Sequence, residues 1–266
     1  MSAAPAPDCF IGWDVGGWNC DRNGKSRDAI VVLDADRRRI GHPWRGNLRQ
    51  VLNEAGSTAA LLARVFALIG ADIEVPRHAV MAIDTPLGFS AAFRELVNGG
   101  PAVDAIGESA TNPYLYRETE LFLFRRGLAP LSAVKDMIGS QATKGIHALA
   151  KFAPVQAECG VWTDGVQLTA IEAYPAACKA SATMARLHAD HDRADYRHDD
   201  HWDALTCALI GWLFANRRDV LEAPHDAVPP GEGWIWVPSD GLTGACLLYT
   251  SPSPRDQRGS RMPSSA

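Results

Sequence analysis

The sequence predicts one α/β domain over residues 9–237, built on a mixed β-sheet. Three observations lead to this prediction. Short apolar runs typical of buried strands are separated by stretches whose apolar residues recur at helical spacing. The first three runs follow one another closely, as antiparallel strands do, whereas the later runs are separated by longer and partly helical stretches. With 266 residues, 47% of them hydrophobic, the chain is able to bury one sizeable core.

The N-terminal segment leads into three expected strands. Residues 1–8 are rich in Ala and Pro and are expected to form a short disordered lead. Residues 9–17 are an apolar run that meets one carboxylate and then two glycines, which free the backbone to turn. We expect further strands at residues 29–33 and 39–44, joined by a charged turn and paired antiparallel.

A helix and a second buried strand are expected next. Apolar residues recur at helical spacing over residues 58–69, behind Ser57 or Thr58, which are typical N-cap residues. Residues 79–83 are an unbroken apolar run, which is typical of a strand covered on both faces. Residues 89–97 are expected to form the following helix.

The middle of the chain carries the weakest pattern. Residues 98–164 are expected to form a helical insertion over one edge of the site, with helices at residues 117–126 and 132–152. An Asp-Gly turn at residues 164–165 then leads into a strand at residues 167–171.

The last expected elements are a helix over residues 198–217 and a short strand over residues 233–237. Residues 238–266 are expected to be a disordered tail, because from Cys246 onward they are rich in Ser, Pro and Arg without periodicity. Residues 246–266 begin with a run that looks like the translation of a transposon-type sequencing adapter. We expect them to be an artefact and exclude them from fold and function.

Composition excludes several classes of protein. The six cysteines show no close paired spacing, which argues against a zinc ribbon. The formal charge of -5 gives no broad basic surface for nucleic acid, so a nuclease hypothesis depends on its site. No segment is long and apolar enough to cross a bilayer, and the N-terminus lacks the basic start and apolar core of a signal peptide. We therefore expect a cytoplasmic protein without a membrane partner.

Carboxylates follow three of the expected strands and open the last helix. Asp14, Asp84 and Glu172 each end an apolar run, and Asp200 and Asp203 lie one helical turn apart. Taken singly, Asp14 and Asp84 have an ordinary explanation as turn residues, and Asp200 as a helix N-cap. Together they favour a site, because the carboxyl ends of parallel strands converge on one crevice. Such a cluster needs hard divalent cations to remain ionised, which predicts Mg²⁺ or Mn²⁺.

Four motifs in this order resemble a known family. They are Asp14 after the first strand, Asp84-x-Pro-x-Gly, Glu172-x-Tyr-Pro, and Asp200-x-x-Asp203-Ala-Leu. Together they are similar to the uncharacterised family of predicted nucleases with an RNase H-like fold, and the last motif is similar to the final helix of the bacterial Holliday-junction resolvases. The resemblance covers nearly the whole expected domain. It implies an RNase H-like mixed sheet, with three antiparallel strands followed by parallel ones and helices on both faces.

The resemblance also implies a two-metal mechanism of phosphodiester hydrolysis. Asp14 would bridge two Mg²⁺ or Mn²⁺ ions, and Asp84 and Asp203 would each complete the shell of one ion. Glu172 or Asp200 would be an additional ligand, with Glu172 counted among the catalytic acids. Two such ions activate a water molecule on one side of a phosphodiester and stabilise the leaving oxygen on the other. The expected partner is nucleic acid, either DNA or RNA.

Residues near these motifs have both a functional and an ordinary interpretation. Arg117, three residues before Glu120, either contacts a substrate phosphate or forms a surface ion pair. Trp18 either stacks on a base or anchors its loop. His198 and His201 either assist a proton transfer or bind a metal, or they are polar residues at an exposed helix start.

Two alternative functions remain. The first is an ATP-handling enzyme of the actin and sugar-kinase type, which also opens with a strand, an acid and glycines. That architecture needs a second acid-glycine loop that leads into a helix, whereas Asp164 and Gly165 stand between strand-like runs. The second alternative is a non-catalytic binding module on the same scaffold, which the acidic charge favours. An acid buried in an ion pair far from the others would favour this module.

Overall fold

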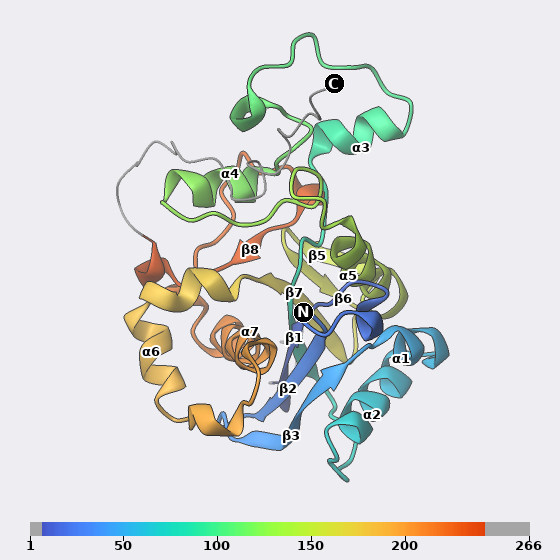
Figure 1. Ribbon diagram of the computed structural model, residues 1–266, viewed down its shortest axis with the longest axis vertical. Coiled ribbons are helices and arrows are strands. Elements are labelled where there is room, and N and C mark those ends of the chain that lie inside the picture. The colour runs from blue at the N-terminus through green and yellow to red at the C-terminus, as the bar shows by residue number, and fades with distance from the viewer. Residues whose placement is uncertain (1–6, 243–266) are drawn as a thin grey trace, which may run out of the picture.

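A mixed sheet of eight strands forms the centre of the computed structural model, which describes residues 7–242 (Figure 1). β1 (Cys9–Asp14) pairs antiparallel with β2 (Asp28–Asp34) and parallel with β4 (Ala79–Asp84), and β4 pairs parallel with β7 (Leu168–Ala173). The predicted α/β class, with antiparallel and parallel strands in one sheet, is confirmed. The spatial order is β3 (Arg39–Gly46), β2 (Asp28–Asp34), β1 (Cys9–Asp14), β4 (Ala79–Asp84), β7 (Leu168–Ala173), β6 (Val161–Thr163) and β5 (Val155–Glu158), with β8 (Ile235–Trp236) also paired to β7.

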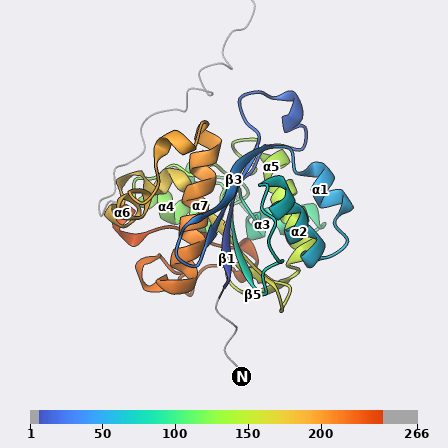
Figure 2. The same cartoon turned by 90° about the horizontal axis from the view of Figure 1, so that it is seen from below.

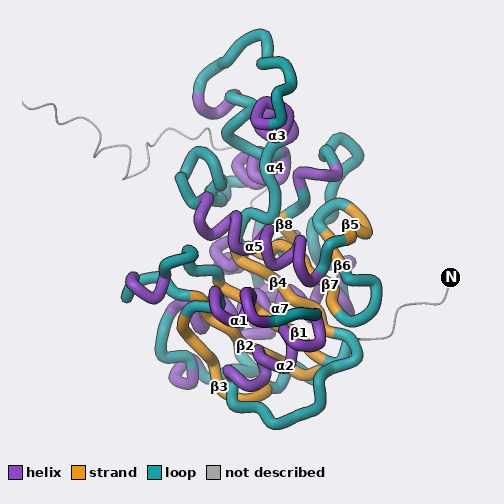
Figure 3. The backbone as a smooth tube through the Cα atoms, turned by 90° about the vertical axis from the view of Figure 1, so that its right-hand side faces the viewer, coloured by secondary structure: helices purple, strands orange, loops and turns teal. Residues whose placement is uncertain are grey.

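Helices cover both faces of the sheet, which Figure 2 shows nearly edge-on. Successive strand residues point to opposite faces, so Ile11 and Trp13 of β1 enter one core and Phe10 enters the other. The core that contains Ile11 and Trp13, the first core, packs against α1 (Arg49–Glu54), α2 (Thr58–Leu68) and α5 (Gly139–Phe152). The core that contains Phe10, the second core, packs against α6 (Ala182–His188) and α7 (Asp199–Asn216). Two further helices, α3 (Ala91–Val97) and α4 (Glu118–Arg125), lie beyond one end of the sheet (Figure 3).

The long helix α7 rests directly on β1 because β1 has a glycine at the contact. A Cβ atom added at Gly12 would lie 1.8 Å from the carbonyl oxygen of Ala204 and 2.5 Å from the backbone nitrogen of Ala208. Only glycine leaves room for the helix backbone at this distance. The contact fixes the N-terminal turns of α7 near the carboxyl end of β1.

Residues 98–164 differ from the expected helical insertion. α4 lies within the helix expected at residues 117–126, but α5 begins only at Gly139, after a turn at residues 133–136. α5 also packs in the first core, and β5 and β6 extend the sheet. The second half of this segment is therefore part of the central architecture, because it covers one sheet face and supplies two strands.

Three elements have no counterpart in the sequence expectations. α1 and α6 contain six and seven residues, which is too short for a helical period to emerge from the apolar pattern. β5 is a four-residue edge strand whose residues are all exposed, so it lacks the apolar signature of a buried strand.

The described chain extends past both ends of the expected domain. The backbone N–H of Asp8 donates to the carbonyl oxygen of His78 at 2.8 Å, and η7 (Ser239–Gly241) is a 3-10 turn within the range expected to be tail. Residues 1–6 and 243–266, which include the adapter-like run at 246–266, lie outside the described residues. In the part of the chain that the structure describes, no helix is both long and apolar enough to span a membrane.

Candidate active site

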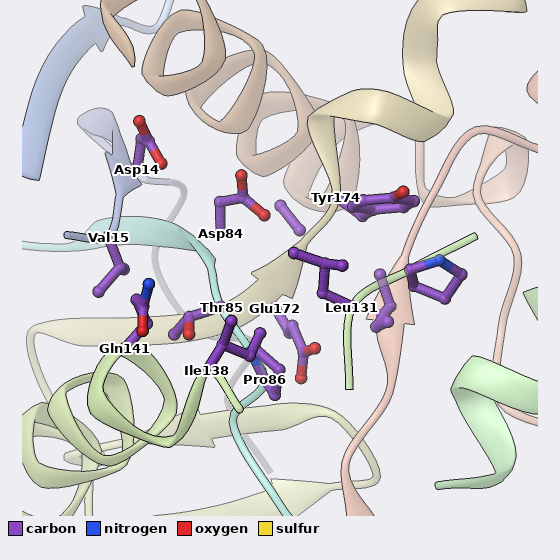
Figure 4. A pocket seen from close by; sticks show the side chains of 13 residues that line it. Asp14, Val15, Asp84, Thr85, Pro86, Leu131, Ile138, Gln141, Glu172 and Tyr174 are labelled. Carbon is purple, nitrogen blue, oxygen red and sulfur yellow. The ribbon is translucent and has the colours of Figure 1, made fainter. Parts of the chain in front are cut away.

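Asp14 and Asp84 lie opposite each other at the carboxyl ends of β1 and β4. The two strands are parallel, and the two residues are direct partners in their register. Both side chains therefore leave the sheet on the same face, the one that α7 covers. Figure 4 shows the two carboxylates together on that side of the strands.

α7 brings two more carboxylates, Asp200 and Asp203, to this pair. Burial raises the pKa of Asp14 well above its usual range, and repulsion from Asp84, Asp200 and Asp203 raises it further. Burial, followed by repulsion from Asp203, raises the pKa of Asp84 to about 8. The pKa of Asp203 is also raised, mainly by burial and then by Asp199. The four aspartates are therefore close enough to repel one another.

Asp200 is held in an ion pair, whereas among the described residues the other three are not. Lys179 and Arg193 lie near enough to Asp203 to oppose the rise of its pKa, but neither forms an ion pair with it. Arg45 Nε on β3 donates to Asp200 Oδ2 at 2.7 Å, and the backbone N–H of Arg27 donates to the same oxygen at 3.2 Å. Among residues 7–242, the side chains of Asp14, Asp84 and Asp203 form no hydrogen bond or ion pair. Three carboxylates are thus left with raised pKa values and without a neutralising group in contact.

Glu172 points away from this cluster. It is paired in register with Ile83, one residue before Asp84, so its side chain leaves the sheet on the opposite face. There Arg117 donates to both carboxylate oxygens, at 2.7 and 2.8 Å, and the backbone N–H of Leu87 donates at 2.9 Å. Glu172 is 2% exposed. The structure therefore does not group Glu172 with the aspartates as an additional metal ligand, although it is near enough to raise the pKa of Asp84.

Arg117 is buried and does not face a substrate. Its Nε donates to Glu120 at 2.9 Å, its Nη1 also donates to the carbonyl oxygen of Glu232 at 3.1 Å, and the side chain is 2% exposed. The expected phosphate contact is not available, because two buried carboxylates hold the guanidinium. The Arg117 and Glu120 pair is an ion pair of the interior rather than of the surface. The second pair of Arg117, with Glu172, joins α4 to β7.

Trp18 anchors its loop to α5. Its backbone N–H donates to Ser140 Oγ at 3.0 Å, and its indole Nε1 donates to Thr143 Oγ1 at 3.1 Å. The ring also makes an edge contact with His147, at a centroid distance of 5.5 Å. These contacts correspond to the loop-anchoring interpretation rather than to a free stacking surface.

The two histidines of the last motif differ in environment. His198 is exposed at the N-cap position of α7, whereas His201 is 8% exposed and neither ring nitrogen has a hydrogen-bond partner among the described residues. Burial, followed by repulsion from His198, lowers the pKa of His201 to about 4. His201 is therefore neutral at physiological pH.

A buried ion pair behind the cluster was not predicted from the sequence. Asp28 and Lys144 are fully buried and in contact, and Asp28 accepts the backbone N–H of Gly16 at 2.8 Å. Lys144 Nζ donates to the carbonyl oxygens of Gly16 and Gly17 at 3.3 and 3.4 Å. The pair therefore fixes the turn that follows Asp14. Its sequence signal is a lysine that lies among the buried small and apolar residues of α5.

A pocket of about 190 Å³ opens beside Asp14 and Asp84 (Figure 4). Thr85, Glu172, Tyr174 and the α5 residue Gln141 supply its other polar groups, and most of its remaining wall is apolar. The pocket lies between the strand ends, the segment at residues 130–138 and the start of α5. It is a space in which a substrate group would lie against the carboxylates.

Within residues 7–242, no three His, Cys, Asp or Glu side chains are arranged to hold a metal ion as they stand.

Comparison with family models gives no match for this chain. Comparisons with curated proteins and with solved structures also give no match.

Proposed function

We propose that this chain is a Mg²⁺- or Mn²⁺-dependent phosphodiesterase that acts on nucleic acid from an RNase H-like scaffold. The observation that carries the proposal is the register pairing of Asp14 with Asp84 on the face covered by α7, within electrostatic reach of Asp203. Repulsion among buried carboxylates costs free energy that a bound cation would relieve. The structure therefore supplies a physical reason for metal binding at this point.

The strand order supports the RNase H-like part of the proposal. β3, β2 and β1 are antiparallel neighbours, and β4 and β7 then continue parallel to β1. α7 packs on the central strand β1 and carries the last two acids. This is the arrangement that the resemblance of the four motifs implies.

No three acidic side chains of residues 7–242 are arranged to hold an ion as they stand, so Asp14, Asp84 and Asp203 would shift to converge on one. Their donor groups suit a hard divalent cation. All of them are carboxylate oxygens, which Mg²⁺ and Mn²⁺ prefer over the nitrogen and sulfur ligands that select zinc. Asp14, Asp84 and Asp203 would hold the metal, because no described partner restrains their side chains. Asp200 would remain with Arg45, which orients it beside the cluster.

When bound, two such ions would activate water and stabilise the leaving oxygen of a phosphodiester. The protein's own residues prepare the site in three ways. The strand ends hold Asp14 and Asp84 half-buried and opposite each other, the contact at Gly12 fixes α7 over β1, and the pair of Asp28 and Lys144 holds the turn after Asp14. Arg45 offsets the negative charge of Asp200 and so reduces the electrostatic repulsion among the four aspartates.

One observation favours a non-catalytic binding module as a second candidate. Glu172, one of the five acids of the four motifs, is buried in an ion pair with Arg117. Glu172 is nevertheless near enough to raise the pKa of Asp84, and among the described residues Asp14, Asp84 and Asp203 form no ion pair. The enzyme proposal therefore remains the stronger one.

The ATP-handling alternative receives no support from the second half of the chain. Asp164 and Gly165 lie in the hairpin between β6 and β7, where Asp164 Oδ1 accepts the backbone N–H groups of Gln167 and Leu168 at 2.8 and 2.9 Å. This acid-glycine pair closes a hairpin and does not lead into a helix.

We also propose a cytoplasmic location, which the free thiols of all described cysteines support.

The test is titration calorimetry with Mg²⁺ and Mn²⁺, followed by cleavage assays on single-stranded, duplex and branched DNA and RNA. Wild type is compared with Asp14→Asn and with Asp36→Asn, an exposed acid at the other end of the sheet. We expect metal binding and metal-dependent cleavage in wild type and Asp36→Asn, with both lost in Asp14→Asn. Metal binding without cleavage would retain the site but reject the nuclease function, and absence of binding would favour the module.

A further inference from the structure

We propose that the pocket beside Asp14 and Asp84 receives one unpaired nucleobase of the strand that is cut. This inference rests on the proposed function and specifies its substrate. The pocket shares both aspartates with the candidate metal site, so its occupant would be covalently adjacent to a phosphodiester held there. It is therefore placed to bind the nucleoside next to the scissile bond.

The walls of the pocket match an uncharged, flat group. Apart from the acids, most of its lining is apolar, and no Lys or Arg contributes to it. Leu131 at its rim is 49% exposed and so is accessible to a ligand. Away from the metal-binding aspartates a phosphate would find no cation in the pocket, whereas a heteroaromatic ring would bury apolar surface there. The apolar wall consists of Val15, Pro86, Pro130, Leu131, Ile138 and Ile235.

Tyr174 and Gln141 provide an aromatic surface for stacking and an amide for hydrogen bonding, the two contacts that a nucleobase makes. The hydroxyl of Tyr174 donates to the carbonyl oxygen of Ala129 at 3.0 Å, which holds the ring in place as a wall close to Asp84. Gln141 of α5 lines the pocket, and its amide forms no hydrogen bond with another described residue. A fixed aromatic ring is able to stack on a base, and an unengaged amide is able to pair with a base edge.

The size of the pocket fits one base. An apolar cavity of about 150 Å³ is large enough to bind benzene, so about 190 Å³ accepts one heterocycle but not a base pair. A base that enters the pocket must therefore leave its stack and its partner. The substrate is accordingly a single strand, a flap or a frayed end, rather than an intact duplex.

The experiment compares two phosphodiesters with the same leaving group in the presence of Mn²⁺. They are thymidine 5′-(p-nitrophenyl phosphate), which carries a base, and methyl p-nitrophenyl phosphate, which does not. We expect wild type to show a kcat/KM at least about tenfold higher for the thymidine compound, the factor typical of one stacked base. Saturation-transfer NMR with thymidine itself, without metal, measures base binding independently of turnover.

The variants test whether the ring and the amide provide this preference. Tyr174→Leu and Gln141→Ala are expected to lower the ratio of the two kcat/KM values by about tenfold and threefold respectively, and to weaken the thymidine signal. Tyr174→Phe retains the ring and is expected to retain the ratio. Val166→Ala, at an exposed hairpin position, is the matched control. Circular dichroism verifies that each variant is folded.

The outcomes separate this inference from the proposed function. Hydrolysis of both compounds with equal kcat/KM, together with no saturation transfer to thymidine, would overturn the base pocket and retain the phosphodiesterase. Hydrolysis of neither compound, with thymidine binding that Tyr174→Leu abolishes, would overturn the proposed function and support the pocket. Equal ratios in wild type and Tyr174→Leu would also reject the pocket.

Discussion

The guanidinium of Arg117 donates two hydrogen bonds, of 2.7 and 2.8 Å, to the carboxylate of Glu172, and both side chains are 2% exposed. The same guanidinium binds Glu120, which is 1% exposed. One cation therefore offsets two carboxylates in the interior. Loss of the cation would leave both acids buried without a partner, which is far more costly than loss of a surface pair.

We therefore expect Arg117→Met to lower the free energy of unfolding by about 3–5 kcal/mol. Urea unfolding monitored by circular dichroism measures this change. The matched control is Arg218→Ala, because Arg218 and Glu158 form an exposed pair that contributes at most about 1 kcal/mol. A loss below about 1 kcal/mol for Arg117→Met would show that the buried acids find other partners.

Gly12 provides a second prediction. A Cβ atom at this position would overlap the backbone of Ala204, so Gly12→Ala forces α7 away from β1. We expect a loss of about 3 kcal/mol or more in unfolding free energy, and weaker Mn²⁺ binding by calorimetry in the protein that remains folded. Gly24→Ala is the control, because nothing lies within 4 Å of its added Cβ, and it should change stability by about 0.5 kcal/mol or less. Equal effects of the two substitutions would contradict the close packing of α7 on β1.

The carboxylate cluster predicts an unusual pH dependence for the metal-free protein. The pKa of Asp84 is raised to about 8, so the folded state holds a proton that the unfolded chain has already released. Stability therefore falls as pH rises toward 8, by at most about 1.4 kcal/mol per pH unit for one such group. Burial lowers the pKa values of His188 and His201 to about 4. These two histidines make stability rise with pH, but only below about pH 6.5, where the unfolded chain still binds their protons.

The measurement is urea unfolding between about pH 6.5 and pH 8 with EDTA and with Mg²⁺. We expect stability to decline with pH in EDTA and the decline to be reduced by Mg²⁺, because a bound cation holds the carboxylates ionised. Asp84→Asn removes one of the carboxyl groups with a raised pKa, and it also removes the repulsion that Asp84 exerts on Asp14, so it should make the decline in EDTA shallower. A wild-type curve that coincides with the Asp84→Asn curve would reject the interpretation of the cluster.

The base pocket predicts a preference among natural substrates. With Mn²⁺, a single strand or a duplex with an unpaired flap should be cut at least about tenfold faster than a blunt duplex of the same sequence, because the duplex must first unstack a base. Gel assays with end-labelled DNA and RNA measure the rates and the position of the cut. Faster cleavage of the blunt duplex would contradict the requirement for an unpaired base.

The sequence predicted the elements whose apolar patterns are long or unbroken. β1, β4 and α7 are of this kind, and their ends locate Asp14, Asp84 and Asp203. α1 and α6 are shorter than two helical turns, so their patterns carry too few apolar positions to indicate a helix.

Register explains why the sequence could not predict the face on which Glu172 lies. The sequence shows that an acid ends an apolar run, but it does not show which residue of the next strand lies opposite. In the structure Glu172 lies opposite Ile83, and this offset of one residue turns its side chain to the other face. Lys144 was missed for a related reason, since its partner Asp28 is far away in sequence and only the folded chain joins them.

The contact between Gly12 and Ala204 also has a consequence for synthesis on the ribosome. Asp14 and Asp84 emerge early, whereas Asp203 arrives only when nearly the whole described chain has left the exit tunnel. A nascent chain that lacks α7 carries two of the three proposed ligands and exposes the sheet face on which this helix docks. Metal affinity would then appear only when the final helix is in place, so the cation would act as a late check that folding is complete.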